Sequence, residues 1–336
     1  MKCRKAELFI VGTSIDPHID AVLRCLGDGI QVCRLDIDQY PMNNEISVDI
    51  RGQSVEVLVR DCFGEIWNVS HPQLLWFRRL GKPGVGHLHS DYIGFALGEI
   101  EQTIEGLLSA VHPVHRINGF WETRLALNKI RQYLFAAKSG LKMPQTLVSN
   151  SPDISIEWMQ GRDVVAKSLS RPLLTTEMSE RGRTFAYTHK ITFDDMCNVA
   201  QIAVTPVQFQ GLIKRDYELR VTSFRGSHHV VAIRSNDLDP NRIDWRATAT
   251  ECEYWSTHLS SETSARLDRL MKQLGIDFAA SDFIVDPSGQ EWFLESNPNG
   301  AWLWLEAFEE EFNFTDWFAK QISNLITGSE DKQSWW

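Results

Sequence analysis

The segment FAASDFIVDPSGQEWFLESN, residues 278–297, constrains the fold most, because two strand-like runs flank the turn sequence DPSG. The segment predicts an antiparallel hairpin. Its second strand carries a carboxylate and an amide, Glu295 and Asn297, within an otherwise apolar run. Because side chains alternate across a strand, both point to the same face. A buried, unpaired carboxylate is costly, so we expect Glu295 to have a cationic partner.

A third oxygen ligand is expected on that face. Closure of the turn by Asp286 and Gly289 sets the register of the two strands. In that register Asp282 lies opposite Phe293 and diagonal to Glu295. Carboxylate and amide oxygens suit Mg²⁺, which keeps several waters and is often completed by substrate phosphates. The alternative is purely structural. In it Asp282 flanks the turn, Glu295 keeps an edge strand soluble, and Asn297 forms a turn before Pro298.

The length of the chain predicts more than one lobe, because 336 residues are too many for one ordinary core. Residues 1–117 alternate strand and helix patterns: ELFIVG and IQVCRLD are strand-like, HIDAVLRCL has helical spacing, and ISVDIRGQSVEVLVR predicts a hairpin. This lobe is expected to be α/β. It has no G-x-G-x-x-G turn after its first strand, and therefore lacks the dinucleotide-binding fingerprint.

Two further segments follow. Residues 118–205 contain the helix pattern RLALNKIRQYLFAAKSGL and the strand patterns MPQTLVSN and DVVAK. Residues 206–328 contain the strand patterns VQFQGLI, ELRVTSF and HHVVAIRS, the amphipathic helix SETSARLDRLMKQLG and the final hairpin. Residues 329–336 are expected to fray.

The helix pattern of the second segment has apolar residues at helical spacing. Leu127, Ile130, Leu134 and Ala137 share one face, and Gly140 is expected to end the helix.

Charge and composition exclude some functions. A net charge of -10 argues against a protein that grips nucleic acid, because such binding depends on neutralised phosphates. No apolar run approaches the length needed to span a membrane. The six cysteines show neither a CxxC pair nor Cys/His metal spacing, which favours a reducing, cytoplasmic location. Trp302 and Trp304 are expected to pack in the core.

The pattern D-x(12)-E-x-N at the end of a hairpin resembles the ATP-grasp ligases, and FLESNPNGAWLW resembles their graspetide (microviridin-type) branch. The runs LLWFRRL, LNKIRQYLFAAKSGLKMPQTLVSN, VVAKSL, VQFQGLIKRDYELRVTSF and IRSNDLDPNRIDWRA occur in that family's order over nearly the whole chain. The resemblance implies an ATP-grasp fold with an N-terminal pre-ATP-grasp α/β domain, a central domain and a C-terminal antiparallel-sheet domain. It also implies ATP and Mg²⁺ as cofactors, and a homodimer.

The resemblance implies a set of nucleotide-binding residues. Two lysines would contact the α- and β-phosphates, the hinge FQGLI would read the adenine edge through its backbone, and a carboxylate would accept the ribose hydroxyls. A solvated lysine and an ordinary core strand are the structural alternatives. The residues are Lys129, Lys167, Gln210, Gly211, Leu212, Ile213 and Glu218, beside the metal ligands Asp282, Glu295 and Asn297.

Two arginines are the catalytic candidates. Arg220 shares a strand face with Glu218, and Arg246 lies in IDWRA, where the family carries an arginine. Guanidinium groups would stabilise the charge that builds on a transferring phosphoryl group, although surface ion pairing is the alternative. D-alanine ligases carry an arginine two residues before the first metal carboxylate, where this chain has Ala280.

The resemblance implies that ATP phosphorylates an Asp or Glu side chain of a ribosomal precursor peptide. A Ser/Thr hydroxyl or Lys amine then displaces phosphate to form an ester or amide. Residues 170–184 would form a lid. The leader would dock near residues 186–203, where Asp194 and Asp195 either pair with the leader or simply begin a helix.

Two other functions stay open. One is an ATP-grasp ligase that joins free amino acids or small acids, as in the glutathione synthetase or glutamate-adding type. The other is a nucleotide- or peptide-binding module without turnover. Loss of water from an intact peptide would support the macrocyclase over a ligase of free amino acids. ADP release would support either ligase over a binding module.

Overall fold

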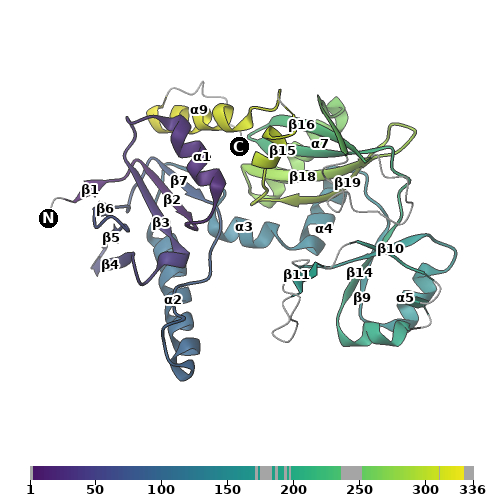
Figure 1. Ribbon diagram of the computed structural model, residues 1–336, viewed down its shortest axis with the longest axis horizontal. Coiled ribbons are helices and arrows are strands. Elements are labelled where there is room, and N and C mark those ends of the chain that lie inside the picture. The colour runs from purple at the N-terminus through teal and green to yellow at the C-terminus, as the bar shows by residue number, and fades with distance from the viewer. Residues whose placement is uncertain are drawn as a thin grey trace.

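The computed structural model describes residues 3–170, 173–174, 184–185, 188–192, 195–196, 198–235, 252–309 and 311–328. Arg246, Asp194, the tail 329–336 and most of the expected lid lie outside these residues. Figure 1 shows the elements gathered around separate sheets, with α3 and α4 running between the N-terminal lobe and the rest.

The N-terminal lobe is α/β, as its alternating patterns predict. A parallel sheet has the order β3-β2-β7-β8, and a second sheet has the order β1-β6-β5-β4. Asp16 caps α1 by accepting a hydrogen bond from His18 N–H, and Pro17 occupies the first turn. The elements are β1 (Arg4–Lys5), β2 (Leu8–Gly12), α1 (Pro17–Leu26), β3 (Val32–Asp36), η1 (Ile37–Gln39), β4 (Glu45–Arg51), β5 (Ser54–Arg60), β6 (Ile66–Asn68), β7 (Leu74–Phe77), α2 (Ser90–Ala110) and β8 (His115–Ile117).

The central sheet has the order β13-β10-β14-β9. Its strand β14 pairs with β9 and β10, so this sheet continues past residue 205, where the sequence pattern placed the end of the second segment. The elements are α3 (Phe120–Ala126), α4 (Lys129–Ser139), β9 (Thr146–Ser149), α5 (Pro152–Met159), β10 (Val164–Lys167), β11 (Leu173–Leu174), β12 (Thr184–Phe185), β13 (His189–Lys190), η2 (Val199–Val204) and β14 (Val207–Gly211).

The C-terminal sheet is antiparallel, with the order β17-β16-β15-β18-β19. One face packs on α7 and α4, and the other contributes Phe224 and Phe278 to a core shared with the N-terminal lobe. Gly275 ends α7 in the left-handed conformation, as expected. The elements are β15 (Tyr217–Phe224), β16 (Ser227–Ser235), β17 (Cys252–Thr257), α7 (Ser261–Leu274), β18 (Phe278–Val285), β19 (Glu291–Asn297), α8 (Leu303–Glu306) and α9 (Phe314–Thr327).

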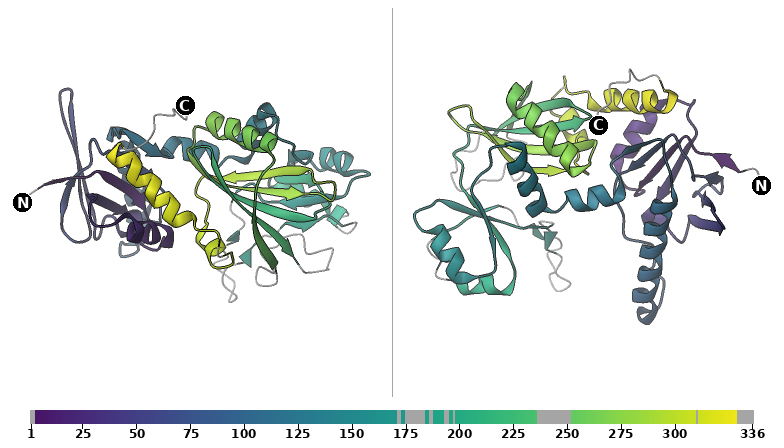
Figure 2. Two further views of the ribbon diagram at one scale, coloured as in Figure 1. Left: turned by 90° about the horizontal axis from the view of Figure 1, so that it is seen from above. Right: turned by 180° about the vertical axis from the view of Figure 1, so that it is seen from behind.

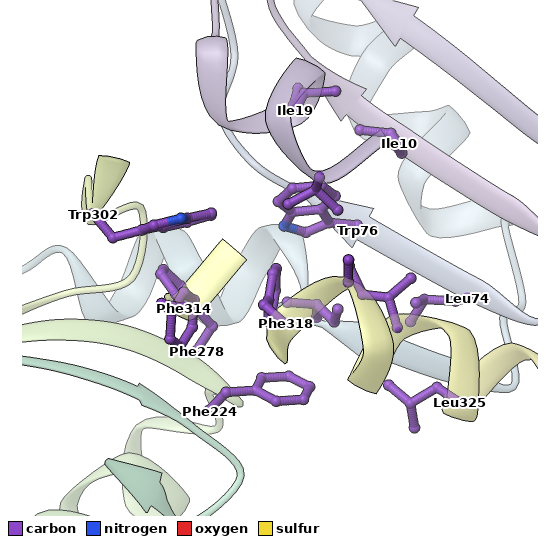
Figure 3. Packing of buried hydrophobic residues seen from close by; sticks show 14 of the residues in the cluster. Ile10, Ile19, Leu74, Trp76, Phe224, Phe278, Trp302, Phe314, Phe318 and Leu325 are labelled. Carbon is purple, nitrogen blue, oxygen red and sulfur yellow. The ribbon is translucent and has the colours of Figure 1, made fainter. Parts of the chain in front are cut away.

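The shared core joins residues from both ends of the chain. Helix α9 crosses from the C-terminal sheet to lie beside α1 (Figure 2). Figure 3 shows Phe318 of α9 among Trp76 of β7, Phe278 of β18 and Trp302. Trp302 is fully buried, which confirms the packing expected for it. None of the described helices has the length and apolar character needed to cross a membrane.

Helix α4 turns its apolar stripe outward. The single helix expected over residues 124–141 is wrong, because α3 ends at Ala126 and Asn128 caps α4. Ile130 and Leu134 of α4 are 46% and 60% exposed, and Leu127 between the helices is 47% exposed. The buried positions include Gln132, whose side-chain amide bonds the backbone of β19 at Ser296. Gln132 faces inward because it ties α4 to the edge strand of the C-terminal sheet, and that role cannot be seen from helical spacing.

Candidate active site

The hairpin of β18 and β19 brings Asp282 and Glu295 directly opposite each other. The expected register was wrong in two ways. The loop is one residue longer, because Asp286 N–H bonds the carbonyl of Gln290. The register also shifts between Asp282 and Phe283, so that Leu294 is an extra residue on β19.

This bulge decides which way Glu295 points. Phe293 pairs with Phe283, and both lie in the core under α7. In a regular strand Glu295 would share that core face with Phe293. Because the bulge shifts the alternation by one residue, Glu295 instead shares the opposite face with Asp282. Asn297 follows on that face, where it pairs with Ala280.

Each carboxylate has a basic partner. Glu295 Oε2 lies 2.9 Å from Lys129 Nζ, and Asp282 Oδ1 lies 2.8 Å from Arg220 Nη1. The four side chains are between 11% and 29% exposed, so water can reach them only in part. Two carboxylates that lie opposite each other on paired strands repel each other, and cations between or beside them relieve that repulsion.

The donor set fits a magnesium ion that is shared with phosphates better than a closed protein cage. Among the described residues, no group of three or more His, Cys, Asp or Glu side chains could hold a metal. Asp282, Glu295 and Asn297 instead offer two carboxylates and one amide, a sparse oxygen set of the kind that Mg²⁺ completes with water and phosphate. The amide oxygen of Asn297 also accepts a hydrogen bond from Asn299 N–H at 3.0 Å, as its structural alternative predicts.

One face of the central sheet turns polar side chains toward α4. Lys167 pairs with Gln208 across β10 and β14, and Gln210 follows two residues later on the same face. Gln208 and Gln210 are almost fully buried. Gln208 Nε2 donates to Tyr133 Oη at 2.7 Å, and Gln210 Nε2 donates to Thr146 Oγ1 at 3.1 Å.

Tyr133 and Gln208 are site residues that the sequence analysis missed. Burial, and then the charge of Glu295, raise the pKa of Tyr133, whose hydroxyl accepts the hydrogen bond from Gln208. Lys129 Nζ also donates to the carbonyl of Ser168 at 3.1 Å, just beyond Lys167. The available signals were Tyr133 one helical turn after Lys129, and a second glutamine two positions before Gln210.

Two N–H groups of the hinge already bond backbone carbonyls of the protein. Gly211 N–H bonds the carbonyl of Gln145 at 2.9 Å, and Leu212 N–H bonds that of Asp163 at 2.8 Å. These two N–H groups are therefore not available to adenine. The hinge groups that remain as candidates for reading the adenine edge are the N–H of Ile213 and the hinge carbonyls. Glu218 is buried and forms an ion pair with Arg215.

Arg220 is fixed on both sides. Besides Asp282, its guanidinium bonds the carbonyl of Ala301 at 3.1 Å through Nη2. Gly300 in the same loop packs on Ala280, because a Cβ built at Gly300 would lie 2.1 Å from the Cβ of Ala280. A large side chain at position 280 has no room, which explains the missing arginine there.

The expected leader-docking segment is described only in part. Asp195 bonds the N–H and hydroxyl of Thr192, each at 2.7 Å, and lies 2.9 Å from His189 Nε2. These local contacts favour the helix-starting alternative for Asp195.

Comparison with known proteins shows a similar domain and a similar fold. Residues 9–124 match the MvdD pre-ATP grasp domain. No protein of curated function is detectably similar to the chain in sequence. Among solved structures, the macrocyclase MdnC of Microcystis aeruginosa MRC, bound with its precursor peptide MdnA, is 26% identical with a TM-score of 0.82 and covers 96% of this chain and 100% of its own.

Two other solved structures share the fold. A RiPP-associated ATP-grasp ligase of Chryseobacterium gregarium, in complex with ADP and a leader and core peptide, is 23% identical with a TM-score of 0.85, covering 98% of each chain. The ATP-grasp ligase PsnB, complexed with minimal precursor, Mg and ADP, is 18% identical with a TM-score of 0.77, covering 97% of this chain and 99% of its own. Over residues 9–124 the chain is therefore similar to the MvdD pre-ATP grasp domain, and as a whole it has the ATP-grasp fold.

Proposed function

We propose that the chain is an ATP-dependent ligase that forms ω-ester or ω-amide macrocycles in a ribosomally made precursor peptide. The observation that carries this proposal is the face-to-face pair of Asp282 and Glu295, each held by a basic side chain. Of these, Lys129 also bonds the carbonyl of Ser168 beside the central sheet. The solved structures of similar fold that hold peptides together with ADP support the same substrate class.

The reaction has two steps. A side-chain carboxylate of the peptide attacks the γ-phosphorus of ATP, which forms an acyl phosphate and releases ADP. A Ser/Thr hydroxyl or Lys amine then attacks the acyl carbon, expels phosphate and loses its proton, so that the peptide loses one water for each ring. The enzyme forms no covalent bond to its substrate and acts by positioning and charge stabilisation.

Each site residue has a role in this scheme. Lys129 and Lys167 neutralise the α- and β-phosphates, the hinge through Ile213 holds adenine, and Glu218 accepts the ribose hydroxyls. Asp282, Glu295 and Asn297 would hold Mg²⁺, which when bound neutralises phosphate charge and orients the γ-phosphoryl group. Arg220 stabilises the charge on the transferring group, and Arg246 is assigned the same task from the sequence resemblance alone.

Mass spectrometry tests the proposal. Purified enzyme with ATP and Mg²⁺ is incubated with synthetic peptides that join a leader to a core rich in Thr, Ser, Lys, Asp and Glu. We expect losses of ~18 Da from an intact peptide, matched by ADP release. Joined amino acids without peptide modification would favour the amino-acid ligase. Nucleotide binding with neither product nor ADP would favour a module without turnover.

Assembly and location are further parts of the proposal. We propose a homodimer in the cytoplasm, by the precedent of the resembling family. Sedimentation of the purified chain at several concentrations measures its mass directly, and a monomer at every concentration would remove the homodimer from the proposal.

A further inference from the structure

Strand β4 stands at the end of one sheet of the N-terminal lobe and has a free edge. The sheet has the order β1-β6-β5-β4, so β4 pairs with β5 on one side, and no other described strand pairs with its other side. Figure 1 shows β4 on the outer side of the N-terminal lobe, away from the central and C-terminal sheets. An open edge is a template for a further strand, because its N–H and carbonyl groups lack partners.

Proteins usually block such an edge with a lysine, a proline, a bulge or a covering segment. Strand β4 has the sequence EISVDIR, without lysine or proline, and its register with β5 is unbroken. Another seven-residue edge strand, β19, is covered, because Gln132 of α4 bonds Ser296 and the carbonyl of Lys142 accepts from Phe293 N–H. Among the described residues, no segment bonds the free side of β4 in this way.

The backbone groups of Val48 point to the free edge. Val57 pairs with Val48 across β5 and β4. The N–H of Val57 donates to Ser70 Oγ and its carbonyl accepts from Val69 N–H, both at 2.9 Å, so both groups point away from β4. Val48 and Val57 are therefore a pair without mutual hydrogen bonds, and such pairs alternate along an antiparallel ladder. The residues whose N–H and carbonyl groups face the free edge are Ile46, Val48 and Ile50.

The apolar face of β4 also lacks cover at this edge. Because side chains alternate along a strand, Ile46, Val48 and Ile50 share one face. Ile46 packs against the core of the N-terminal lobe, whereas Val48 is 37% and Ile50 is 69% exposed. The apolar surface of the core thus continues along β4 and remains exposed there.

The sequence of β4 is complementary to itself in one antiparallel register. With Val48 opposite Val48 of a second copy, Glu45 lies opposite Arg51, and the two isoleucines lie opposite each other. This register pairs opposite charges and sets the free hydrogen-bonding groups of both strands against each other. A shift by two residues sets either Glu45 opposite Asp49 or Asp49 opposite itself, and like charges in such positions destabilise a strand pair.

We propose that β4 pairs with β4 of a second copy about a twofold axis at Val48, which joins two four-stranded sheets into one. A twofold axis brings the same surface of both copies together, and antiparallel pairing of identical strands has this symmetry. The charge complementarity of β4 with itself favours a second copy over an unrelated strand. The proposed interface rests on the homodimer of the proposed function and goes beyond it by naming the surface.

The first test mixes two charge variants. Glu45→Arg sets like positive charges opposite each other in a dimer, and Arg51→Glu sets like negative charges. Because two pairs in each dimer change sign, we expect the dissociation constant of each variant alone to rise by at least about tenfold. An equimolar mixture should regain association close to that of the wild type, because each variant supplies the charge that the other needs. Sedimentation measures the mass in each case.

The mixture also controls for effects within each chain. Glu45 forms an ion pair with Arg60, and Arg51 forms one with Asp49, so each substitution disturbs its own hairpin. These disturbances are the same whether a variant is alone or mixed, whereas the pairs between copies differ. A mixture that associates no better than either variant alone would overturn the proposal.

The second test changes the backbone and the apolar face. Val48→Pro removes an N–H that faces the free edge, a position where an edge strand tolerates proline. We expect a folded monomer at concentrations where the wild type and Val48→Thr, which keeps the N–H, are dimers. Ile50→Lys should weaken the dimer as well, while Ile154→Lys, at an isoleucine of α5 that is 55% exposed, should not. Circular dichroism checks that each variant is folded.

Mass in solution is measured without turnover, so these tests separate the interface from the proposed reaction. A wild-type dimer that Val48→Pro and Ile50→Lys leave intact would overturn the β4 interface and keep the homodimer. A wild type that is a monomer at every concentration would overturn both. Protection of the β4 amides from hydrogen exchange only after the precursor peptide is added would also overturn the proposal, by assigning this edge to a peptide strand.

Discussion

Glu295 is the residue where a small change tests the proposed chemistry most directly. Glu295→Gln keeps the shape of the side chain but removes the charge that faces Asp282 and Lys129. We expect a normally folded protein that loses ATP-dependent product by at least about a hundredfold, because a magnesium ligand is lost. Product is followed by mass spectrometry, and folding by circular dichroism and melting temperature.

A matched control for this change lies on the strand at the opposite edge of the sheet. Glu253 of β17 stands in the same sheet but outside the carboxylate pair, opposite Arg234. Glu253→Gln should therefore leave product formation within about twofold of wild type. If Glu295→Gln turned over like the wild type, the metal role of Glu295 would be wrong.

His18 predicts a dependence of stability on pH. Its neutral ring donates to Asp16 and accepts from Trp302 N–H, while burial, and then Arg78 and Arg79, disfavour its protonation and lower its pKa. Because the pKa of His18 is lower in the folded protein than its ordinary value of 6.5, the unfolded chain binds more protons below that value. This contribution to stability is present above pH 6.5 and is lost as the pH falls through the lowered pKa.

The measurement is the melting temperature of the wild type and of His18→Gln as the pH is lowered. Glutamine is uncharged at every pH, so the variant should melt lower at neutral pH and show a weaker decline on acidification. An identical decline in both proteins would show that other groups cause it.

At the scale of the element, α4 predicts opposite outcomes for its two faces. Gln132→Leu would leave the N–H and carbonyl of Ser296 and the carbonyl of Ala126 without their partner, and should lower the free energy of unfolding by about 2 to 4 kcal/mol. Leu134→Gln changes a side chain that is 60% exposed and should cost less than about 0.5 kcal/mol. Urea unfolding measures both. Equal losses would contradict the orientation of α4.

Local pattern was enough to predict most elements but not how they face one another. The hairpin over residues 278–297 and the helix ending at Gly275 follow from alternation, turn residues and caps, which depend on neighbours in sequence. The bulge at Leu294 and the outward stripe of α4 depend on tertiary contacts that periodicity does not record. The family resemblance proposed site positions, and the bulge is the reason why Glu295 nevertheless reaches the same face as Asp282.

At the scale of the whole molecule, the proposed site collects residues that no local pattern connects. Lys129 and Glu295 form an ion pair although they are 166 positions apart in the sequence. Arg220 of β15 donates to the carbonyl of Ala301, in the loop after β19. Arg78 lies over the Trp302 ring, and His18 accepts from Trp302 N–H, because the N-terminal lobe packs against the loop after β19. A motif scan of single segments could not find such a cluster.

Trp302 predicts how far the lobes unfold together. Its ring is fully buried and contacts His18 of the N-terminal lobe, Phe278 of β18 and Phe318 of α9. Trp302→Ala should cost about 3 to 5 kcal/mol and, because these contacts come from both lobes, should separate their unfolding into two calorimetric transitions. Trp302→Phe keeps most of the packing and loses the bond from Nε1 to Thr315 Oγ1, so it should lower the melting temperature less and keep the transitions together. A single transition in Trp302→Ala, shifted no further than in Trp302→Phe, would show that the lobes are joined by other contacts.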